Sequence, residues 1–227
     1  MGFVLLEGMP GVTLRDRLKS GHGAWPSPEA IDALLRLLAE TGPDGWPGRA
    51  SRTGDALAHA ELLGTVAPGA VTALTALRRQ LAASLDDVVA RSGPVVHGDL
   101  HEGQLLVDGS GAITGLIDID DLGPGDPVDD PATLLGHLEY RSITATDPRL
   151  SARVHDHVVD LRDHFGAIHG TGPLELVTAA VLVGLATGPF RVQATGWAPM
   201  TMAVVDTARR WADRAAATGV GGTGVGE

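Results

Sequence analysis

Two stretches near the middle of the chain decide the fold. The first is Val95-Val-His-Gly-Asp-Leu-His-Glu-Gly-Gln104, and the second is Leu116-Ile-Asp-Ile-Asp-Asp-Leu-Gly-Pro-Gly-Asp-Pro127. Each begins with apolar residues typical of a buried strand and continues into polar residues and glycines typical of a loop. Between them, residues 104–108 and 113–119 flank a Gly-Ser-Gly turn, which predicts a β-hairpin. The sequence therefore predicts a short strand, a polar loop and a hairpin in succession.

Polar side chains gather at the ends of this hairpin. Alternate residues of a strand share a face, so Asp118 and Asp120 are expected to point one way and the isoleucines beside them into the core. Gln104 begins the hairpin whose other arm ends at Asp118, and Asp99 lies in the loop just before it. The hairpin is therefore expected to bring Gln104 and Asp118 together near Asp99.

This set of side chains suits phosphoryl transfer, which depends on positioning and on charge neutralisation. Such a reaction needs a carboxylate that orients the attacking hydroxyl and oxygen ligands for Mg²⁺. Two other chemistries fit less well. His97 and His101 are four residues apart, but Gly98 and the preceding strand argue against a helical zinc pair. A metallohydrolase would need a His–carboxylate spacing that the Asp cluster does not show.

The net charge of −11 is concentrated in one segment. Between Ser92 and Tyr140 there are ten acidic residues and no Lys or Arg, a charge of −10, which leaves −1 for the rest of the chain. Carboxylates that converge without basic partners attract a cation, either a divalent metal or a cationic ligand. The acidic balance argues against a general nucleic-acid-binding protein. The absence of cysteine excludes a disulfide scaffold and a thiol nucleophile.

Most of the remaining chain shows helical periodicity. A strand is expected over residues 2–6, followed by the turn Glu7-Gly-Met-Pro-Gly11, and the Gly-rich tail after residue 218 is expected to be disordered. The uncharged run Leu176–Phe190 is too short to span a bilayer and predicts a buried helix. The opening apolar run is too short for a signal peptide.

Four histidines are expected to lie on a solvated helix: His155, His157, His164 and His169. Helices are predicted over residues 12–20, 28–41 with Ser27 as N-cap, 53–64, 69–91, 131–141 with Asp130 as N-cap, 148–165, 173–187 and 199–216.

The sequence resembles the aminoglycoside phosphotransferase and choline kinase-like superfamily, whose members are relatives of protein kinases. The resemblance rests on the order and spacing of His97-Gly98-Asp99, Gln104, Ile117-Asp118, Gly125-Asp126-Pro127 and Asp130-Pro131-Ala132. It implies an α+β, mostly helical fold, namely a protein-kinase-like C-terminal lobe in which a small β-hairpin carries the site. By this likeness, residues 1–11 form the hinge strand and linker, residues 12–217 form the lobe, and residues 218–227 form the tail.

The same resemblance implies roles for individual residues. Asp99 would be the catalytic base, and His97 would brace the catalytic loop. Gln104 and Asp118 would hold Mg²⁺, and Asp120 would be either a further metal contact or a solvated carboxylate. The backbone of Glu7 and Met9 would meet the adenine ring of the nucleotide. Asp126 and Asp130 would fix the loop and cap the following helix.

Two features depart from the family pattern. Gln104 stands where most members have Asn, but its amide can still offer an oxygen to Mg²⁺. The second departure concerns the N-terminal lobe, whose Gly-rich loop and strand lysine the family places before the hinge. This sequence has no such segment before residue 2, and Lys19, the only lysine, follows the hinge, so it is not expected to be that lysine. The resemblance predicts a cytoplasmic enzyme that moves the γ-phosphoryl of ATP or GTP to a small-molecule hydroxyl, such as that of an aminosugar. The alternative is a catalytically incomplete remnant or binding module that lacks the N-terminal nucleotide lobe.

Overall fold

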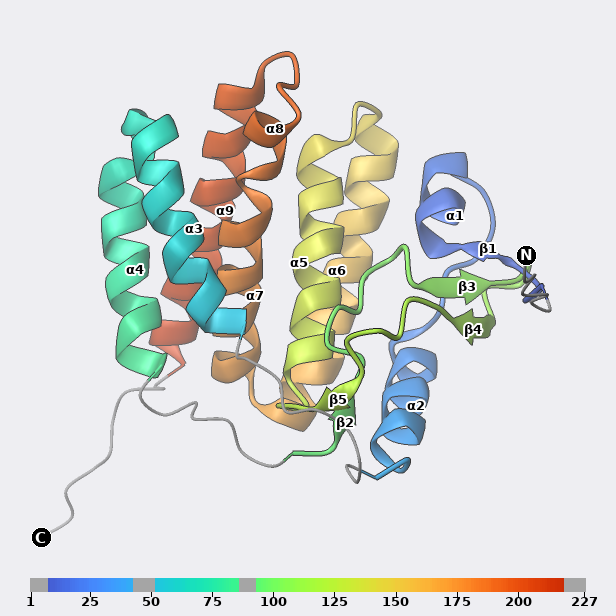
Figure 1. Cartoon of the computed structure of the whole chain (residues 1–227). Coiled ribbons are helices and arrows are strands. Elements are labelled where there is room, and N and C mark those ends of the chain that lie inside the picture. The colour runs from blue at the N-terminus through green and yellow to red at the C-terminus, as the bar shows by residue number, and fades with distance from the viewer. Residues whose placement is uncertain (1–7, 43–51, 86–92, 219–227) are drawn as a thin grey trace, which may run out of the picture.

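The computed structural model describes residues 8–42, 52–85 and 93–218. Helices dominate this part of the chain, and two small antiparallel sheets lie beside them (Figure 1). The helices are α1 (Leu14–Ser20), α2 (Pro28–Ala39), α3 (Arg52–Val66), η1 (Pro68–Ala70), α4 (Val71–Leu85), α5 (Asp129–Thr144), α6 (Pro148–His169), α7 (Thr171–Leu185), α8 (Gly188–Arg191) and α9 (Trp197–Ala217). The strands are β1 (Val12–Thr13), β2 (Val95–Val96), β3 (Leu105–Val107), β4 (Ile113–Leu116) and β5 (Gly123–Pro124).

The predicted helices are confirmed within the described residues, except that Val12 and Thr13, expected in the first helix, form strand β1 instead. Ser27 is the N-cap of α2, as predicted, and its side chain accepts a hydrogen bond from the Ala30 N–H. The predicted strand over residues 2–6, the greater part of the loop over 42–50, the end of the helix over 69–91 and the tail lie outside the described residues. The short helix α8 is an addition that the sequence did not predict.

Helix α7 is the centre of the helical layer. It packs against α3, α5, α6 and α9 (Figure 1), and its buried side chains are mostly small or aliphatic, which lets several neighbours approach closely. By length and composition alone, the segment Thr171–Arg191 could cross a membrane. Most of it is buried inside the bundle, as the sequence predicted, which is the pattern of a core helix in a globular protein.

The strands form two sheets that carry the loops of the site. In the larger sheet β3 lies between β1 and β4, and the β3–β4 pair is the predicted hairpin. Its turn is fixed by Asp108, whose carboxylate accepts hydrogen bonds from the Ser110 hydroxyl and N–H and from the Ala112 N–H. These bonds lower the pKa of Asp108. In the second sheet β2 pairs with β5, which joins the two quoted stretches of sequence.

The prediction for the histidines of α6 is wrong for three of the four. Helix α2 and Trp25 cover the face of α6 that the sequence assigned to solvent. His164 lies 3.6 Å from the buried Asp32 of α2, and the His157 ring packs edge-on against Trp25 at 5.5 Å. Burial lowers the pKa of His157 and of His169. His155 alone of the four is exposed.

Candidate active site

The loop between β2 and β3 is held in place by a residue at the start of α5. The Asp130 carboxylate, 2% exposed, accepts hydrogen bonds from the backbone N–H groups of His97 at 2.6 Å and Gly98 at 2.7 Å. Gly98 has a φ of +83°, a conformation that a side chain disfavours. The prediction that Asp130 is an N-cap is wrong, because α5 begins at Asp129 after Val128. Asp130 therefore anchors the loop rather than its own helix.

His97 connects this loop to the far end of the hairpin. Its side chain is fully buried, and Nε2 lies 3.1 Å from the Ile117 carbonyl oxygen. Its Nδ1 accepts a hydrogen bond from the Asp99 N–H at 3.3 Å, so the ring proton is on Nε2 and is donated to Ile117. The His97 ring thus ties the backbone of Asp99 to the strand end that precedes Asp118.

Gln104 and Asp118 lie in contact, at the ends of the two hairpin strands. The side-chain amide nitrogen of Gln104 donates to Asp118 Oδ2 at 2.8 Å. The main-chain carbonyl of Gln104 accepts from the Ile117 N–H at 3.0 Å. Gln104 is buried, whereas Asp118 is exposed. The amide oxygen of Gln104 and the Asp118 carboxylate form an oxygen donor set of the kind that Mg²⁺ prefers, so these residues fit the metal.

The predicted strand alternation around Asp118 is wrong. Strand β4 ends at Leu116, and Asp118 has a φ of +60°, in the left-handed region that only Asn, Asp and Gly visit readily. Ile119 is consequently 51% exposed rather than directed into the core. Asp120 is also exposed, in the turn that the Leu122 N–H closes on the Ile119 carbonyl. Backbone strain of this kind is concentrated at functional sites.

Of the other predicted site residues, Asp99 and Met9 lie in the described part of the chain. Asp99 is half-buried in the loop, and its charge raises the pKa values of His101 and His137, against the larger effect of burial. Met9 is half-exposed, and its methyl group lies over Gly115 of β4, where a Cβ would overlap with it. Glu7 lies outside the described residues.

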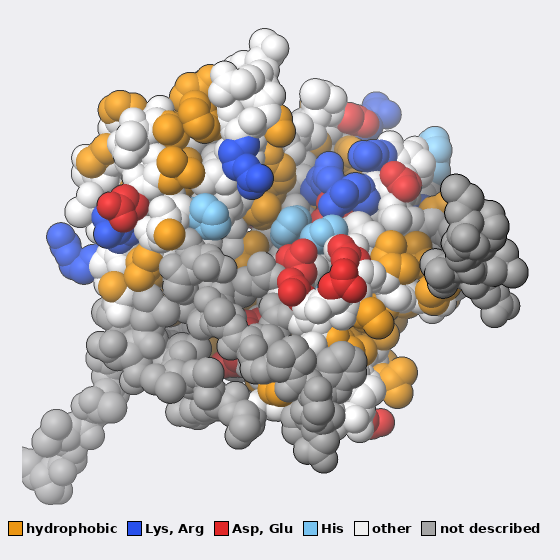
Figure 2. All heavy atoms as spheres, viewed as in Figure 1, with side chains coloured by type: hydrophobic (Ala, Val, Ile, Leu, Met, Phe, Trp, Pro, Cys, Tyr) orange, Lys and Arg blue, Asp and Glu red, His pale blue; other side chains and the backbone are white. Residues whose placement is uncertain are grey.

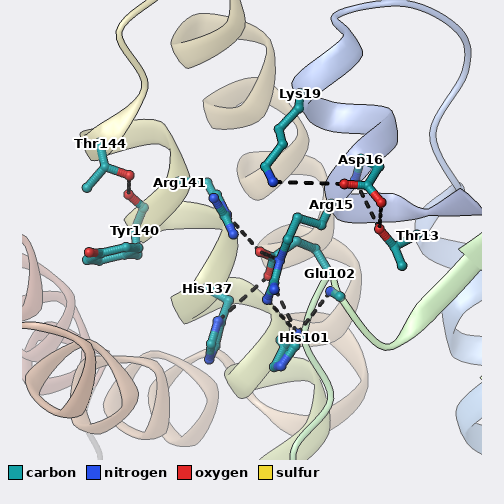
Figure 3. Close-up of polar contacts among 11 residues, drawn as sticks. Thr13, Arg15, Asp16, Lys19, His101, Glu102, His137, Tyr140, Arg141 and Thr144 are labelled. Atoms are coloured by element: carbon teal, nitrogen blue, oxygen red, sulfur yellow. Dashed lines mark hydrogen bonds and ion pairs between the residues drawn. The ribbon is translucent and has the colours of Figure 1, made fainter. Parts of the chain in front are cut away.

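The sequence did not predict the ion cluster around Glu102, a fully buried residue of this loop (Figure 3). Its Oε1 accepts hydrogen bonds from Arg15 Nε at 3.1 Å and Arg141 Nε at 2.7 Å. Its Oε2 lies 3.9 Å from His101 Nδ1 and 3.7 Å from His137 Nδ1. Burial acts to raise the pKa of Glu102, but the imidazole of His137 and the two guanidinium groups outweigh it and hold the pKa below its ordinary value.

This cluster corrects the interpretation of the acidic segment. Glu102 has basic partners after all, because α1 supplies Arg15 and the end of α5 supplies Arg141. Other acids of the segment also serve the fold: Asp108 fixes a turn, Asp126 accepts from the Val128 N–H, and Asp130 holds the loop. The charge of −10 is therefore not all directed at one ligand.

The donor atoms of His101, Glu102 and His137 lie within 4.8 Å of one another, which is close enough for a metal. Two observations argue for a charge cluster instead. The His101 Nδ1 lone pair already accepts from the Gly103 N–H at 2.9 Å, and two guanidinium groups repel a second cation from Glu102. The His97–His101 zinc pair is also excluded, because both ring nitrogens of His97 have backbone partners.

Burial lowers the pKa of His137 from 6.5 to about 4. Its charged neighbours are Glu102 and Asp99, which raise it, and His101 and Arg15, which lower it. In the unfolded chain the His137 imidazole takes up a proton near pH 6.5, whereas in the folded chain it takes up the proton only near pH 4. The unfolded state therefore binds more protons between these values, and the free energy of unfolding decreases as the pH falls.

We expect the free energy of unfolding to fall by about 1.4 kcal/mol per pH unit from His137 alone over that interval. Urea denaturation of the wild type and of His137→Gln between pH 4 and pH 8 measures this slope. The variant should show a shallower slope than the wild type. The matched control is His22→Gln, because His22 is exposed and its replacement should leave the slope unchanged. Equal slopes for wild type and His137→Gln would contradict the assignment.

Residues 1–163 match the sequence model of the phosphotransferase enzyme family. The chain belongs to the phosphotransferase enzyme family. The match contains all of the loop, the hairpin and the residues of α5 that anchor them. No curated protein matches the chain.

Two solved structures of aminoglycoside 2′-phosphotransferase-IIIa share the fold of this chain. One is the GDP complex of a point mutant of aminoglycoside 2′-phosphotransferase-IIIa, with a TM-score of 0.54 at 16% identity, covering 93% of this chain and 70% of that one. The other is the GDP complex of the wild-type enzyme, with a TM-score of 0.51 at 19% identity, covering 89% and 69%. At these identities the likeness shows the fold, and the fold is the kinase-like one that the sequence predicted.

Proposed function

We propose that this chain transfers the γ-phosphoryl group of ATP or GTP to a hydroxyl group of a small molecule. The observation that carries the proposal is the contact between Gln104 and Asp118 at 2.8 Å, on a hairpin tied through His97 to the backbone of Asp99. A general base and an oxygen donor set are thereby held on neighbouring loops. Membership of a phosphotransferase family supports the reaction class.

In this proposal Asp99 accepts the proton of the acceptor hydroxyl as the hydroxyl oxygen attacks the γ-phosphorus. Gln104 and Asp118 would hold Mg²⁺, with Asp120 as a further exposed carboxylate on the same turn. When bound, Mg²⁺ would neutralise phosphate charge. Asp130 and His97 keep the base in position through the backbone, and neither needs to touch the substrate.

The nucleotide would lie against the segment that precedes α1, where the backbone of Met9, and of Glu7 outside the described residues, would meet the base. Met9 lies over β4, the hairpin strand that leads to Asp118 of the Gln104–Asp118 pair, and this position supports the placement. Such an enzyme works where ATP and GTP are found, so we place it in the cytoplasm. Its partners are then a nucleotide and a small hydroxylated molecule.

Nucleotide binding tests the proposal through a predicted loss. Titrating the protein with a fluorescent ATP or GTP analogue should show binding that depends on Mg²⁺. We expect Asp118→Asn to weaken the Mg²⁺-dependent part by roughly tenfold or more, since it removes a charged oxygen ligand. Asp121→Asn makes the same change three residues away and should bind like the wild type.

Phosphoryl transfer is then measured with neutral, cationic and anionic hydroxylated acceptors, including an aminoglycoside. Transfer to any of them supports the proposed reaction. Mg²⁺-dependent binding with no transfer across the panel would favour the alternative, a chain that binds nucleotide without catalysis. An affinity that neither Mg²⁺ nor Asp118→Asn changes would contradict the metal assignment.

A further inference from the structure

A cavity of about 660 Å³ lies between α1 and the turn that joins α5 to α6. Its lining is basic, although the whole chain carries a charge of −11. Five of the chain's 17 Lys and Arg residues line it, with a single carboxylate: Arg15, Lys19, Arg141, Arg149, Arg153 and Asp147. Figure 2 shows Lys and Arg side chains gathered on this face, next to His side chains, with acidic side chains beyond them.

The cavity is next to the candidate catalytic loop. Arg15 and Arg141 line the cavity and also bind Glu102, three residues after Asp99 (Figure 3). The Arg15 N–H donates to the Glu102 carbonyl at 2.8 Å, which fixes α1 against the loop. His101 and His137, which contact Glu102, both feel the charge of Asp99. The Glu102 cluster therefore connects the wall of the cavity to the loop that carries Asp99.

The positive charge of the cavity is only partly neutralised. Glu102 offsets the charge of Arg15 and Arg141, and Asp147, the N-cap of α6, offsets that of one further base of the five. Arg153 donates to the Gly21 carbonyl and lies over the Trp25 ring, contacts that leave its charge in place. Among the described residues, Lys19 pairs with the exposed Asp16 at 3.9 Å, a distance at which an exposed pair gains little.

We propose that this cavity binds the acceptor and that the acceptor is an anion, a small hydroxylated molecule bearing a carboxylate or phosphate group. The inference rests on the proposed phosphotransferase function and names its substrate class. Arg and Lys side chains around a cavity recognise carboxylate and phosphate oxygens by charge-assisted hydrogen bonds. The ammonium groups of an aminosugar would instead be repelled, so the cationic acceptor expected from the acidic segment does not fit here.

The transfer itself balances for such an acceptor. The hydroxyl oxygen of the anion forms a bond to the γ-phosphorus, and the bond from that phosphorus to the bridging oxygen breaks. The hydroxyl proton passes to Asp99, and the nucleoside diphosphate leaves with the bonding electron pair. The anionic group takes no part in the chemistry and serves only to hold the acceptor against the basic wall.

Binding of matched sugars tests the proposal independently of catalysis. Glucose 6-phosphate, gluconate, glucose and glucosamine have similar size and hydroxyl content but differ in charge. Each is titrated against the full chain without nucleotide, by NMR chemical-shift perturbation and calorimetry. We expect the two anions to bind more tightly than glucose and glucosamine, and their affinity to fall as salt is added.

Variants locate the binding. Lys19→Ala and Arg149→Ala each remove a charge that does not contact Glu102, and each should weaken anion binding by roughly tenfold. Arg209→Ala is the matched control, because Arg209 pairs with Asp213 on the exposed side of α9. Anion binding lost in both cavity variants supports the site even if no transfer is detected, which separates this inference from the proposed function. Equal or tighter binding of glucosamine, no anion binding, or anion binding that both variants leave unchanged would overturn it.

Discussion

Replacing Asp99 with Asn is expected to slow phosphoryl transfer by about 10²–10⁴-fold without unfolding the protein. The amide keeps the size of the side chain but cannot accept the hydroxyl proton. Asp99 donates to His97 Nδ1 through its backbone N–H, so the substitution leaves that bond in place. The loop should also keep its anchor, because Asp130 binds the N–H groups of His97 and Gly98.

Single-turnover transfer with the acceptor found in the panel measures the effect of Asp99→Asn. Nucleotide affinity and the thermal midpoint, taken on the same preparation, show whether only the chemical step has changed. Asp121→Asn removes a carboxylate from the neighbouring exposed turn and should retain the wild-type rate. A rate for Asp99→Asn within threefold of the wild type would remove Asp99 from the role of base.

Local sequence patterns predicted the elements that carry the site. The hairpin followed from two apolar runs around a Gly-Ser-Gly turn, and the start of α2 followed from Ser27 before a proline. These features depend on residues close together in the chain. The juxtaposition of Gln104 and Asp118 was predictable for the same reason, because antiparallel pairing in a short hairpin fixes which residues meet.

Errors appeared where tertiary contacts override local preference. Asp130 before Pro131 has the sequence of an N-cap, yet its carboxylate binds a loop 32 and 33 residues earlier. Asp118 follows an alternating strand pattern, yet the strand stops two residues before it. The polar face of α6 suggested solvent, but α2 covers it. Each depends on which distant segment packs there, and periodicity carries no such information.

The Glu102 cluster is the clearest case of a feature invisible to local pattern. Arg15 is 87 residues before Glu102 and Arg141 is 39 residues after it. The sequence shows an acidic segment without bases, and only the fold reveals that bases from α1 and α5 enter it. Gly103 makes room for Arg15, because a Cβ there would lie 2.8 Å from its guanidinium group. The same two arginines then form the edge of the basic cavity, so one cluster both orders the loop and sets the charge of its surroundings.

Replacing Glu102 is expected to have the largest effect on stability. Glu102→Ala leaves Arg15 and Arg141 facing each other without their shared carboxylate, and breaking a buried pair costs about 3–5 kcal/mol. The two arginine side chains are 35% and 33% exposed, so they can regain some hydration, and we expect the lower end, about 3 kcal/mol. Urea denaturation at pH 7 gives the change in the free energy of unfolding.

Two further variants separate charge from packing in this cluster. Glu102→Gln keeps the shape and removes only the charge, so most of the loss should remain if the ion pairs matter. A combined replacement of Glu102, Arg15 and Arg141 by Leu, Met and Met should recover much of the stability, because a buried ion cluster is often replaceable by apolar packing. Glu61→Ala, on the exposed face of α3, is the matched control and should change stability by less than about 0.5 kcal/mol. A loss below about 1 kcal/mol in Glu102→Ala would mean that the arginines find other partners and that the cluster does not hold α1 against the loop.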